Sequence, residues 1–566
     1  MTLKKLICSL LLLALLTTPL LVMAQERLLI LAPDEFMGKL APLERFKDGS
    51  VRPTTLLSLA YVYNNYSGKD TPEQIKKCIA DYEKKHGVRY VMLVGDCDKF
   101  PVRYLCRDAT VPKGFQPGDL YYADLYNADK SFNNWDGNGN GLYGQLDGTS
   151  ANNNLDNINW YPDVIVARVP ASNISEVSIF VEKVISYELR TTNSGWFKKA
   201  LLVTGNWDQD ITTKDYIAAN YLGGFNVIKH YHTTVWQQYP IDPNDVAGSM
   251  DRRAAPMTNY INQGVGFLNH YGHGSIDDFS WVYDKRHLNN LTNTTKLPVV
   301  FSCGCSTAEF APNPPWQDYY DINNNFHGGH APGANEVVPI PKPIQPGQGA
   351  IFNCDREARP EDWLVNRTAG AVAYIGSAGT ANPGYPPKLD KPFFEAYHSG
   401  KRTLGEVWKH VLNKYINEVF DANGNVKHSE EWHRYAGWNG VVRFMLFGDP
   451  TLRIGGAFLS NLSGNVSNTS GGPLMGFGRY RIIGDVTIPA GQTLSADSSL
   501  SILFEDGKKI KASGTSPNSG FIVNATYTPP ITFLSLSPDP QSDHVIHGIK
   551  INGQLRLKNG GEIKLY

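Results

Sequence analysis

The sequence predicts an α/β fold with mostly parallel sheets flanked by helices, followed by a separate all-β module. Short β-branched runs in the first part are almost continuously apolar, as in strands buried on both faces of a sheet. Amphipathic segments with helical periodicity separate these runs. Beyond Gly455 the helical periodicity disappears and alternation of period two takes over, which predicts strands alone.

Eight apolar runs in the first part are predicted to be buried strands. They occupy 27–33, 89–96, 163–170, 198–205, 226–232, 264–272, 297–303 and 370–377. Helices are predicted over 71–87, 172–189 and 403–420, the first and third opened by capping boxes at 71–74 and 403–406. Cys78 falls on the apolar face of the first helix, so we expect it to be a packing residue.

The length of 566 residues exceeds that of one ordinary domain, and four segments are expected. Residues 1–24 are a predicted signal peptide, because Lys4 and Lys5 precede an apolar run over 6–16, which a Thr-Pro break at 18–19 and small residues before a cleavage boundary after Ala24 follow. An uncleaved anchor is the alternative. An N-terminal α/β subdomain (25–190), a catalytic α/β subdomain (191–455) and a C-terminal β-domain (456–566), solenoid-like or a sandwich, follow. No other run is long enough to span a membrane, so we expect a secreted or cell-surface protein.

The composition excludes two classes of protein. With 53 basic and 54 acidic residues the formal charge is −1, which provides no basic surface for nucleic acid. A content of 42% hydrophobic and 11% aromatic residues is too high for a disordered chain. We therefore expect a folded protein that does not bind nucleic acid.

Two predicted strands end in residues that suit nucleophilic catalysis. His273 lies between two glycines just past one strand, and Cys305 follows another. Open α/β folds place their sites at this carboxyl edge of the sheet. An imidazole beside a thiol favours the nucleophilic thiolate, and the glycines leave backbone N–H groups available to hold an oxyanion.

Two other interpretations of these residues stay open at this point. His270, His273, Cys303 and Cys305 are ligand types that suit zinc, although the cysteine spacing is shorter than in structural zinc sites. Alternatively, both cysteines are buried strand residues, as free cysteines usually are.

The surrounding residues resemble those of the gingipain-type cysteine peptidases. The family's histidine motif, Asn-x-x-Gly-His-Gly-Ser after a strand, is matched by 269–275. Its nucleophile is followed by two residues, a small residue, an acidic or polar one and Phe, which 305–310 match with Ala308 in place of the usual glycine. The resemblance implies a caspase-like α/β catalytic domain in which Cys305, not Cys303, is the nucleophile.

Three further segments extend this resemblance over roughly 25–455. They are 91–96 followed by Pro101, 161–168, and 446–452. In gingipain-like enzymes the strand matched by 161–168 provides an acidic partner for the histidine, so the resemblance implies that Asp163 orients His273. It also implies that the backbone N–H groups of Gly274 and Cys305 hold the oxyanion.

A second group of polar residues matches the twelve-residue calcium loop. The oxygen-bearing positions of the pattern fall on Asp136, Asn138, Asn140, Leu142 (through its carbonyl) and Asp147. Aspartate replaces the usual glutamate at the last position, so any Ca²⁺ bound would be held weakly. The alternative is a turn rich in Asn and Gly, which those residues favour in any case.

Together these features predict a secreted cysteine endopeptidase that forms an acyl-enzyme with protein or peptide substrates and needs no organic cofactor. One alternative is a non-catalytic, calcium-stabilised surface binding protein. The other is a processing transpeptidase of exported proteins, in which an amine replaces water as the acyl acceptor.

Overall fold

The computed structural model describes most of the first 457 residues and only the strands and short segments beyond them. The described residues are 27–48, 53–108, 114–192, 194–205, 208–333, 336–345, 348, 359–457, 460–470, 474, 479–490, 492–496, 501–504, 509–512, 520–525, 531–535, 548–551, 553–557 and 562–564. The predicted signal peptide, 1–24, lies outside them. Nowhere in these ranges is a helix long and apolar enough to cross a membrane.

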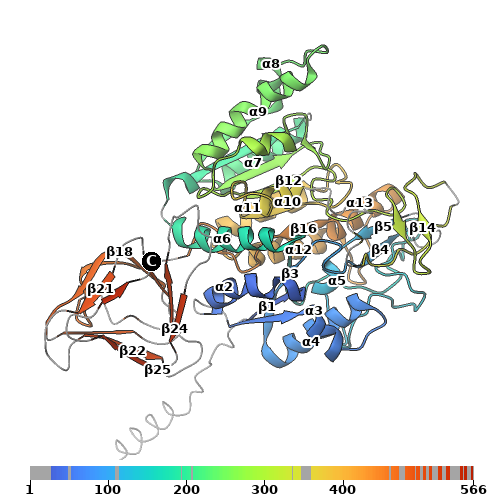
Figure 1. Ribbon diagram of the computed structural model, residues 1–566. Coiled ribbons are helices and arrows are strands. Elements are labelled where there is room, and N and C mark those ends of the chain that lie inside the picture. The colour runs from blue at the N-terminus through green and yellow to red at the C-terminus, as the bar shows by residue number, and fades with distance from the viewer. Residues whose placement is uncertain are drawn as a thin grey trace, which may run out of the picture.

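A ten-stranded sheet forms the centre of the α/β part (Figure 1). Its order is β2 (Thr54–Ser58), β1 (Arg27–Ala32), β3 (Val88–Val94), β6 (Ile165–Val169), β16 (Phe444–Phe447), β15 (Ala373–Ser377), β12 (Val299–Cys303), β9 (Phe267–Tyr271), β7 (Lys199–Thr204) and β8 (Asn226–His230). The first five strands are mutually parallel, and so are the last five. The antiparallel pair β15–β16 joins the two sets.

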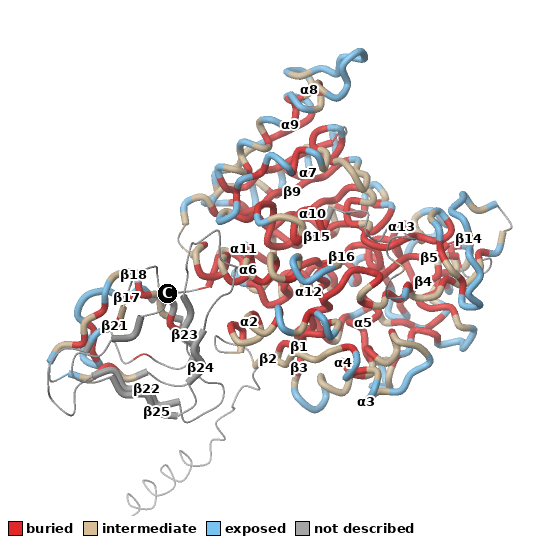
Figure 2. The backbone as a smooth tube through the Cα atoms, viewed as in Figure 1, coloured by how far each residue is buried: buried red, intermediate tan, exposed pale blue. Residues whose placement is uncertain are grey.

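This topology confirms the eight predicted strands and adds β2 and β16. It also shows that the segments predicted as 25–190 and 191–455 share one sheet, because β16 from the second segment pairs with β6 from the first. The sheet is covered on both faces. Consecutive residues of β6, β9, β12 and β15 point to opposite faces and are all buried, as Figure 2 shows in red.

Helices connect these strands. They are α2 (Met37–Asp48), α3 (Leu59–Asn65), α4 (Thr71–His86), α5 (Leu120–Ala123), α6 (Ile174–Arg190), α7 (Asp208–Tyr221), α8 (His232–Gln238), α9 (Val246–Gln263), α10 (Arg359–Leu364), α11 (Pro387–His398), α12 (Leu404–Val419) and α13 (Glu431–Val442). The three predicted helices are α4, α6 and α12, and Cys78 is fully buried on α4 as expected.

The predicted capping boxes are wrong, although the helices are present. The N-cap of α4 is Asp70, whose carboxylate accepts the N–H of Glu73 at 3.1 Å. At α12 the side chain of Thr403 makes no capping hydrogen bond. A neighbouring aspartate is an equally good acceptor for the first-turn N–H groups, so the sequence pattern left the cap of α4 uncertain by one residue.

Beyond residue 459 every described element is a strand. They are β17 (Ser460–Asn465), β18 (Arg479–Ile488), β19 (Thr493–Ala496), β20 (Ser501–Phe504), β21 (Lys509–Ala512), β22 (Gly520–Ala525), β23 (Ile531–Ser535), β24 (Gly548–Ile551), β25 (Gly553–Leu557) and β26 (Glu562–Lys564). Most pairs along the chain are parallel, such as β18 with β20 and β19 with β22. Antiparallel partners, β24, β25 and β26, lie at the sheet edges.

A buried ion pair anchors β9 to two helices. Lys214 of α7 and Asp390 of α11 are fully buried, and Lys214 Nζ lies 2.5 Å from Asp390 Oδ2. Asn269 of β9 completes the group, since its Oδ1 accepts from Lys214 at 2.6 Å and its Nδ2 donates to Asp390 Oδ1 at 2.8 Å. The same Nδ2 donates to the carbonyl of Phe301 on β12 at 3.2 Å. The asparagine of the histidine motif therefore holds the β9–β12 strand pair in place.

Replacing Asp390 by Asn is expected to destabilise the protein by roughly 3–5 kcal/mol, because it leaves the Lys214 ammonium buried without its counter-charge. Chemical denaturation of the mature protein measures this loss. Lys388→Ala on the same helix is the matched control, since the Lys388–Glu418 pair is solvent-exposed and is worth at most about 1 kcal/mol. Equal losses for the two variants would contradict a special role for the buried group.

Candidate active site

The hydrogen-bonded ladder between β9 and β12 brings the two candidate residues together. In this parallel pair Cys303 lies opposite Tyr271. Two residues further along each chain are Cys305 and His273, so both lie just beyond the carboxyl ends of adjacent parallel strands, at the same edge of the sheet. Sequence and structure therefore agree on where this pair lies in the sheet.

The segments that contain the pair are in direct contact. A Cβ atom added to Gly274 would lie 2.5 Å from Cγ2 of Thr307, 3.0 Å from the carbonyl oxygen of Cys305 and 3.2 Å from Cα of Gly304. Such distances are too short for non-bonded carbon and oxygen atoms, so only glycine fits at this position. The missing side chain lets the histidine segment approach the cysteine segment closely.

The Cys305 thiol lies partly buried under loop 378–382, which follows β15. The backbone N–H of Ala381 is 3.4 Å from Sγ, and the carbonyl oxygen of Ala381 is 3.6 Å from it. The next residue, Ser306, donates its N–H to the carbonyl of Gly379 at 2.7 Å and has φ of 50°. Two backbone contacts thus fix the position of the thiol against this loop.

Ala308, which stands where the family usually has glycine, is fully buried. Its N–H donates to the carbonyl of Ser377 at 2.9 Å. Space for its methyl group comes from Gly376 on β15, where an added Cβ would lie 2.9 Å from that of Ala308. The extra methyl is thereby accommodated without displacing the cysteine segment.

The side chain of His273 is exposed at the edge of the sheet. Its carbonyl oxygen accepts a hydrogen bond of 2.6 Å from Ser280 Oγ, which belongs to the hairpin of β10 (Asp278–Phe279) and β11 (Tyr283–Asp284). Ser280 and Trp281 have φ of 50° and 59°. Side chains other than glycine rarely adopt this region, and strained residues of this kind cluster at functional sites.

The two backbone groups expected to hold an oxyanion have no acceptor within the described part of the chain. Neither the N–H of Gly274 nor that of Cys305 donates a hydrogen bond there. They lie on the adjoining His273 and Cys305 segments. Both are thus available to a ligand at this edge of the sheet.

The structure does not bring Asp163 to His273, contrary to the expectation from the resemblance. Asp163 precedes β6, and β16, β15 and β12 lie between β6 and β9. At about 4.8 Å per strand this separation is roughly 19 Å. The Asp163 carboxylate instead accepts the backbone N–H groups of Leu125 and Tyr126 at 2.8 and 3.1 Å. Asp163 therefore fixes the local chain and does not orient the imidazole.

Sequence analysis missed a cationic side chain near the thiol. Arg443 is 3% exposed and donates from Nη1 to the carbonyl of Thr380 at 3.1 Å, on loop 378–382. Burial, together with the nearby charge of Arg107, lowers the pKa of Arg443 to about 9 against the opposing effect of Cys305 and Glu309. A lone charge within the apolar run 441–447 was the signal that could have identified this residue.

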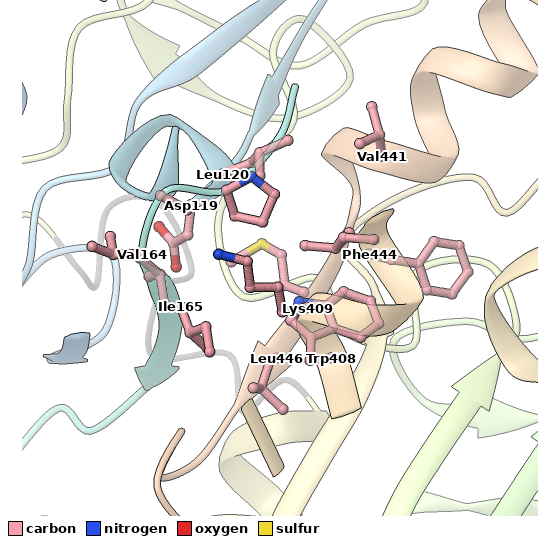
Figure 3. A pocket seen from close by; sticks show the side chains of 14 residues that line it. Asp119, Leu120, Val164, Ile165, Trp408, Lys409, Val441, Phe444 and Leu446 are labelled. Atoms are coloured by element: carbon pink, nitrogen blue, oxygen red, sulfur yellow. The ribbon is translucent and has the colours of Figure 1, made fainter. Parts of the chain in front are cut away.

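A small cavity of about 30 Å³ lies over β6 and β16, at the amino ends of these strands. Figure 3 shows Asp119 and Lys409 among its otherwise apolar walls. Asp119 is held by two hydrogen bonds of 2.8 Å from Arg168. Neither His273 nor Cys305 lines this cavity, and it has room for ordered water but not for a peptide, so it is not the substrate site.

The zinc interpretation gains no support. His270 contacts two serines, described below, and Cys303 is 1% exposed. No group of three or more His, Cys, Asp or Glu side chains suited to a metal ion occurs among the described residues.

The candidate calcium loop is closed by its own hydrogen bonds. Asp136 accepts the N–H of Gly141 at 3.1 Å and pairs with Lys69 at 3.1 Å. Asn138 and Asn140 both donate to Gln145, whereas Asp147 accepts from Thr149 at 2.9 Å. The carboxylates of Asp136 and Asp147 are thus both occupied by protein donors. Calcium stays a prediction, and no step below depends on it.

Comparisons with known proteins identify relatives of this chain. The sequence model of Peptidase family C25 matches residues 23–455. Gingipain R2 of Porphyromonas gingivalis is 23% identical over 250 residues, which are 42% of this chain and 26% of that protein. Lys-gingipain of the same organism is 29% identical over 163 residues, 27% of this chain and 8% of that protein. This chain therefore matches about a quarter or less of the length of these relatives.

The fold has a counterpart among solved structures. The crystal structure of the Arg-specific cysteine proteinase gingipain R matches with a TM-score of 0.51 and 17% identity, over 80% of this chain and 85% of that chain. At this identity the match shows the fold alone, and it confirms the expected caspase-like α/β architecture. Because the family model matches most of the sequence, the chain belongs to peptidase family C25.

Proposed function

We propose that this protein is an exported cysteine endopeptidase in which Cys305 is the nucleophile and His273 is the general acid and base. The observation that supports the proposal best is the contact between the two segments that follow β9 and β12, in which Gly274 packs against the backbone of Gly304 and Cys305. Cys303 is a poor alternative nucleophile. Burial raises the pKa of the Cys303 thiol well above its usual range, which disfavours the thiolate.

The proposed reaction proceeds through a thioester. Cys305 Sγ attacks the scissile carbonyl carbon as a thiolate, and the carbonyl oxygen becomes an oxyanion against the N–H groups of Gly274 and Cys305. Collapse of this intermediate breaks the C–N bond, and the His273 imidazolium gives its proton to the leaving amine. The neutral imidazole then takes a proton from water as the water oxygen attacks the thioester carbon. The C–S bond breaks, the acid product leaves, and the thiolate–imidazolium pair is regenerated.

Export is supported by the cysteine chemistry as well as by the predicted signal peptide 1–24. Cys97 is disulfide-bonded, whereas four other described cysteines, Cys78, Cys106, Cys303 and Cys305, are free. Disulfides persist in oxidising compartments and are rare in the cytosol. A secreted or surface location is therefore part of the proposal.

Replacing Cys305 by Ala is expected to lower kcat/KM at least ~10³-fold while leaving the melting temperature nearly unchanged, because the nucleophile is lost but little packing is removed. The measurement is cleavage of labelled casein and of a mixed-residue peptide library by the mature protein under reducing conditions. Cys303→Ala is the matched control and should keep most of the activity. An active Cys305→Ala beside an inactive Cys303→Ala would reverse the assignment of the nucleophile.

The same experiment separates the two alternative functions. A wild-type protein that neither cleaves any substrate nor labels at Cys305 with peptidyl acyloxymethyl ketones would favour the non-catalytic binding protein. Products capped by an added primary amine, at the expense of hydrolysis, would favour the transpeptidase. Mass spectrometry of the products distinguishes a capped carboxyl end from a free one.

Replacing Asp163 by Ala is expected to lower the free energy of unfolding by about 1 to 3 kcal/mol, because two backbone N–H groups lose their acceptor. It should leave kcat/KM and its pH profile unchanged, since the residue lies several strands from His273. Kinetics across pH, together with thermal denaturation, test both parts. A pH profile that moves without a loss of stability would show that Asp163 acts on the imidazole after all.

A further inference from the structure

A second histidine lies buried beneath the proposed catalytic pair. His270 of β9 is fully buried, and its ring stacks on Phe279 with centroids 4.6 Å apart. Its Nδ1 is 2.9 Å from Ser302 Oγ on β12, and its Nε2 is 3.0 Å from Ser280 Oγ in the β10–β11 hairpin. The ring therefore connects the strand before Cys305 to the hairpin beside His273.

The directions of these hydrogen bonds follow from their proton count. The single hydroxyl proton of Ser280 is donated to the carbonyl oxygen of His273, at 2.6 Å. Ser280 Oγ must then accept from His270, which places a proton on Nε2. When the ring carries this one proton only, Nδ1 is an acceptor and the Ser302 hydroxyl donates to it.

The other end of this series of hydrogen bonds reaches the cysteine segment. Ser302 Oγ, having donated its proton to His270, accepts the backbone N–H of Gly304 at 3.4 Å. A Cβ added to Gly304 would lie 3.1 Å from Cε1 of His270, so the ring is also in packing contact with that residue. One uninterrupted series of donors and acceptors thus runs from Gly304 to the carbonyl of His273.

Backbone strain occurs at the hairpin end of the series. Ser280 has φ of 50°, although a glycine there would avoid the steric cost. Its hydroxyl is the group that glycine would lack, and this hydroxyl is the one bonded to His273. The strained backbone of Ser280 therefore occurs where a serine hydroxyl bonds to the His273 carbonyl.

We propose that His270 is a positioning residue that sets the backbone of His273 relative to the Cys305 segment through Ser280 and Ser302. The inference rests on the proposed function. The ring does not touch the substrate in this role. It fixes the distance and angle between imidazole and thiol, on which proton transfer to the leaving amine depends.

Replacing Ser280 by Ala is expected to lower kcat by about 10- to 100-fold with KM nearly unchanged, because a displacement near 1 Å at the imidazole is costly in the transition state. His270→Phe, which keeps the stacked ring but removes both nitrogens, should cause a similar loss. The double variant should lose no more than either single variant, since both remove the same contact. The rates are measured with labelled casein and with the peptide of the library that the wild-type protein cleaves fastest.

Two further variants separate this role from general stability. Ser280→Gly relieves the strain yet lacks the hydroxyl, and should be as slow as Ser280→Ala. His270→Gln, whose amide both donates and accepts, should be more active than His270→Phe. Melting temperatures are measured for each protein. Additive losses in the double variant, or wild-type kcat in Ser280→Ala, would overturn the inference. A wild-type protein without cleavage or Cys305 labelling would instead overturn the proposed function.

Discussion

The register between β9 and β12 is the constraint on which the candidate site depends. Successive side chains of a strand point to opposite faces, so a slip of one residue would shift the His273 segment along the Cys305 segment and exchange the side chains that β9 presents to its two covered faces. Main-chain hydrogen bonds alone do not choose between registers. Asn269 favours the observed register, because its amide bonds to the Phe301 carbonyl across the ladder and to the buried Lys214–Asp390 pair. The fixed charge pair thereby helps to align the segments that contain His273 and Cys305.

Close approach at the carboxyl edge depends on small residues on both sides. Gly274 removes the side chain that would separate the histidine and cysteine segments, and Gly376 makes room for the methyl group of Ala308. Beneath them, His270 fills the space between the two segments with a ring that has a polar contact at each nitrogen. The site therefore combines rigid strands with a tightly packed turn on each side, and loop 378–382 covers the thiol.

Local pattern was enough to predict eight of the ten strands of the central sheet, the helices α4, α6 and α12, and the place of His273 and Cys305 just beyond two strands. Apolar runs show which segments are buried strands, and their ends show which residues lie at an edge. Strand order is not local information. Asp163 precedes a strand and lies near an edge, as the sequence indicates, but three strands separate it from β9. Arg443 was missed for a similar reason, because only tertiary packing brings its strand next to loop 378–382.

The position of β16 has a consequence for the order in which the chain can fold. β16 occupies the space between β6 and β15, yet it comes from residues 444–447, nearly 280 positions after β6. Synthesis proceeds from the amino end, so the two parallel halves of the sheet emerge before the strand that joins them. Each half has an unpaired edge until then, and that contact is among the most non-local in the fold. The central sheet is thus completed late, after the strands of the candidate site are already available to pair.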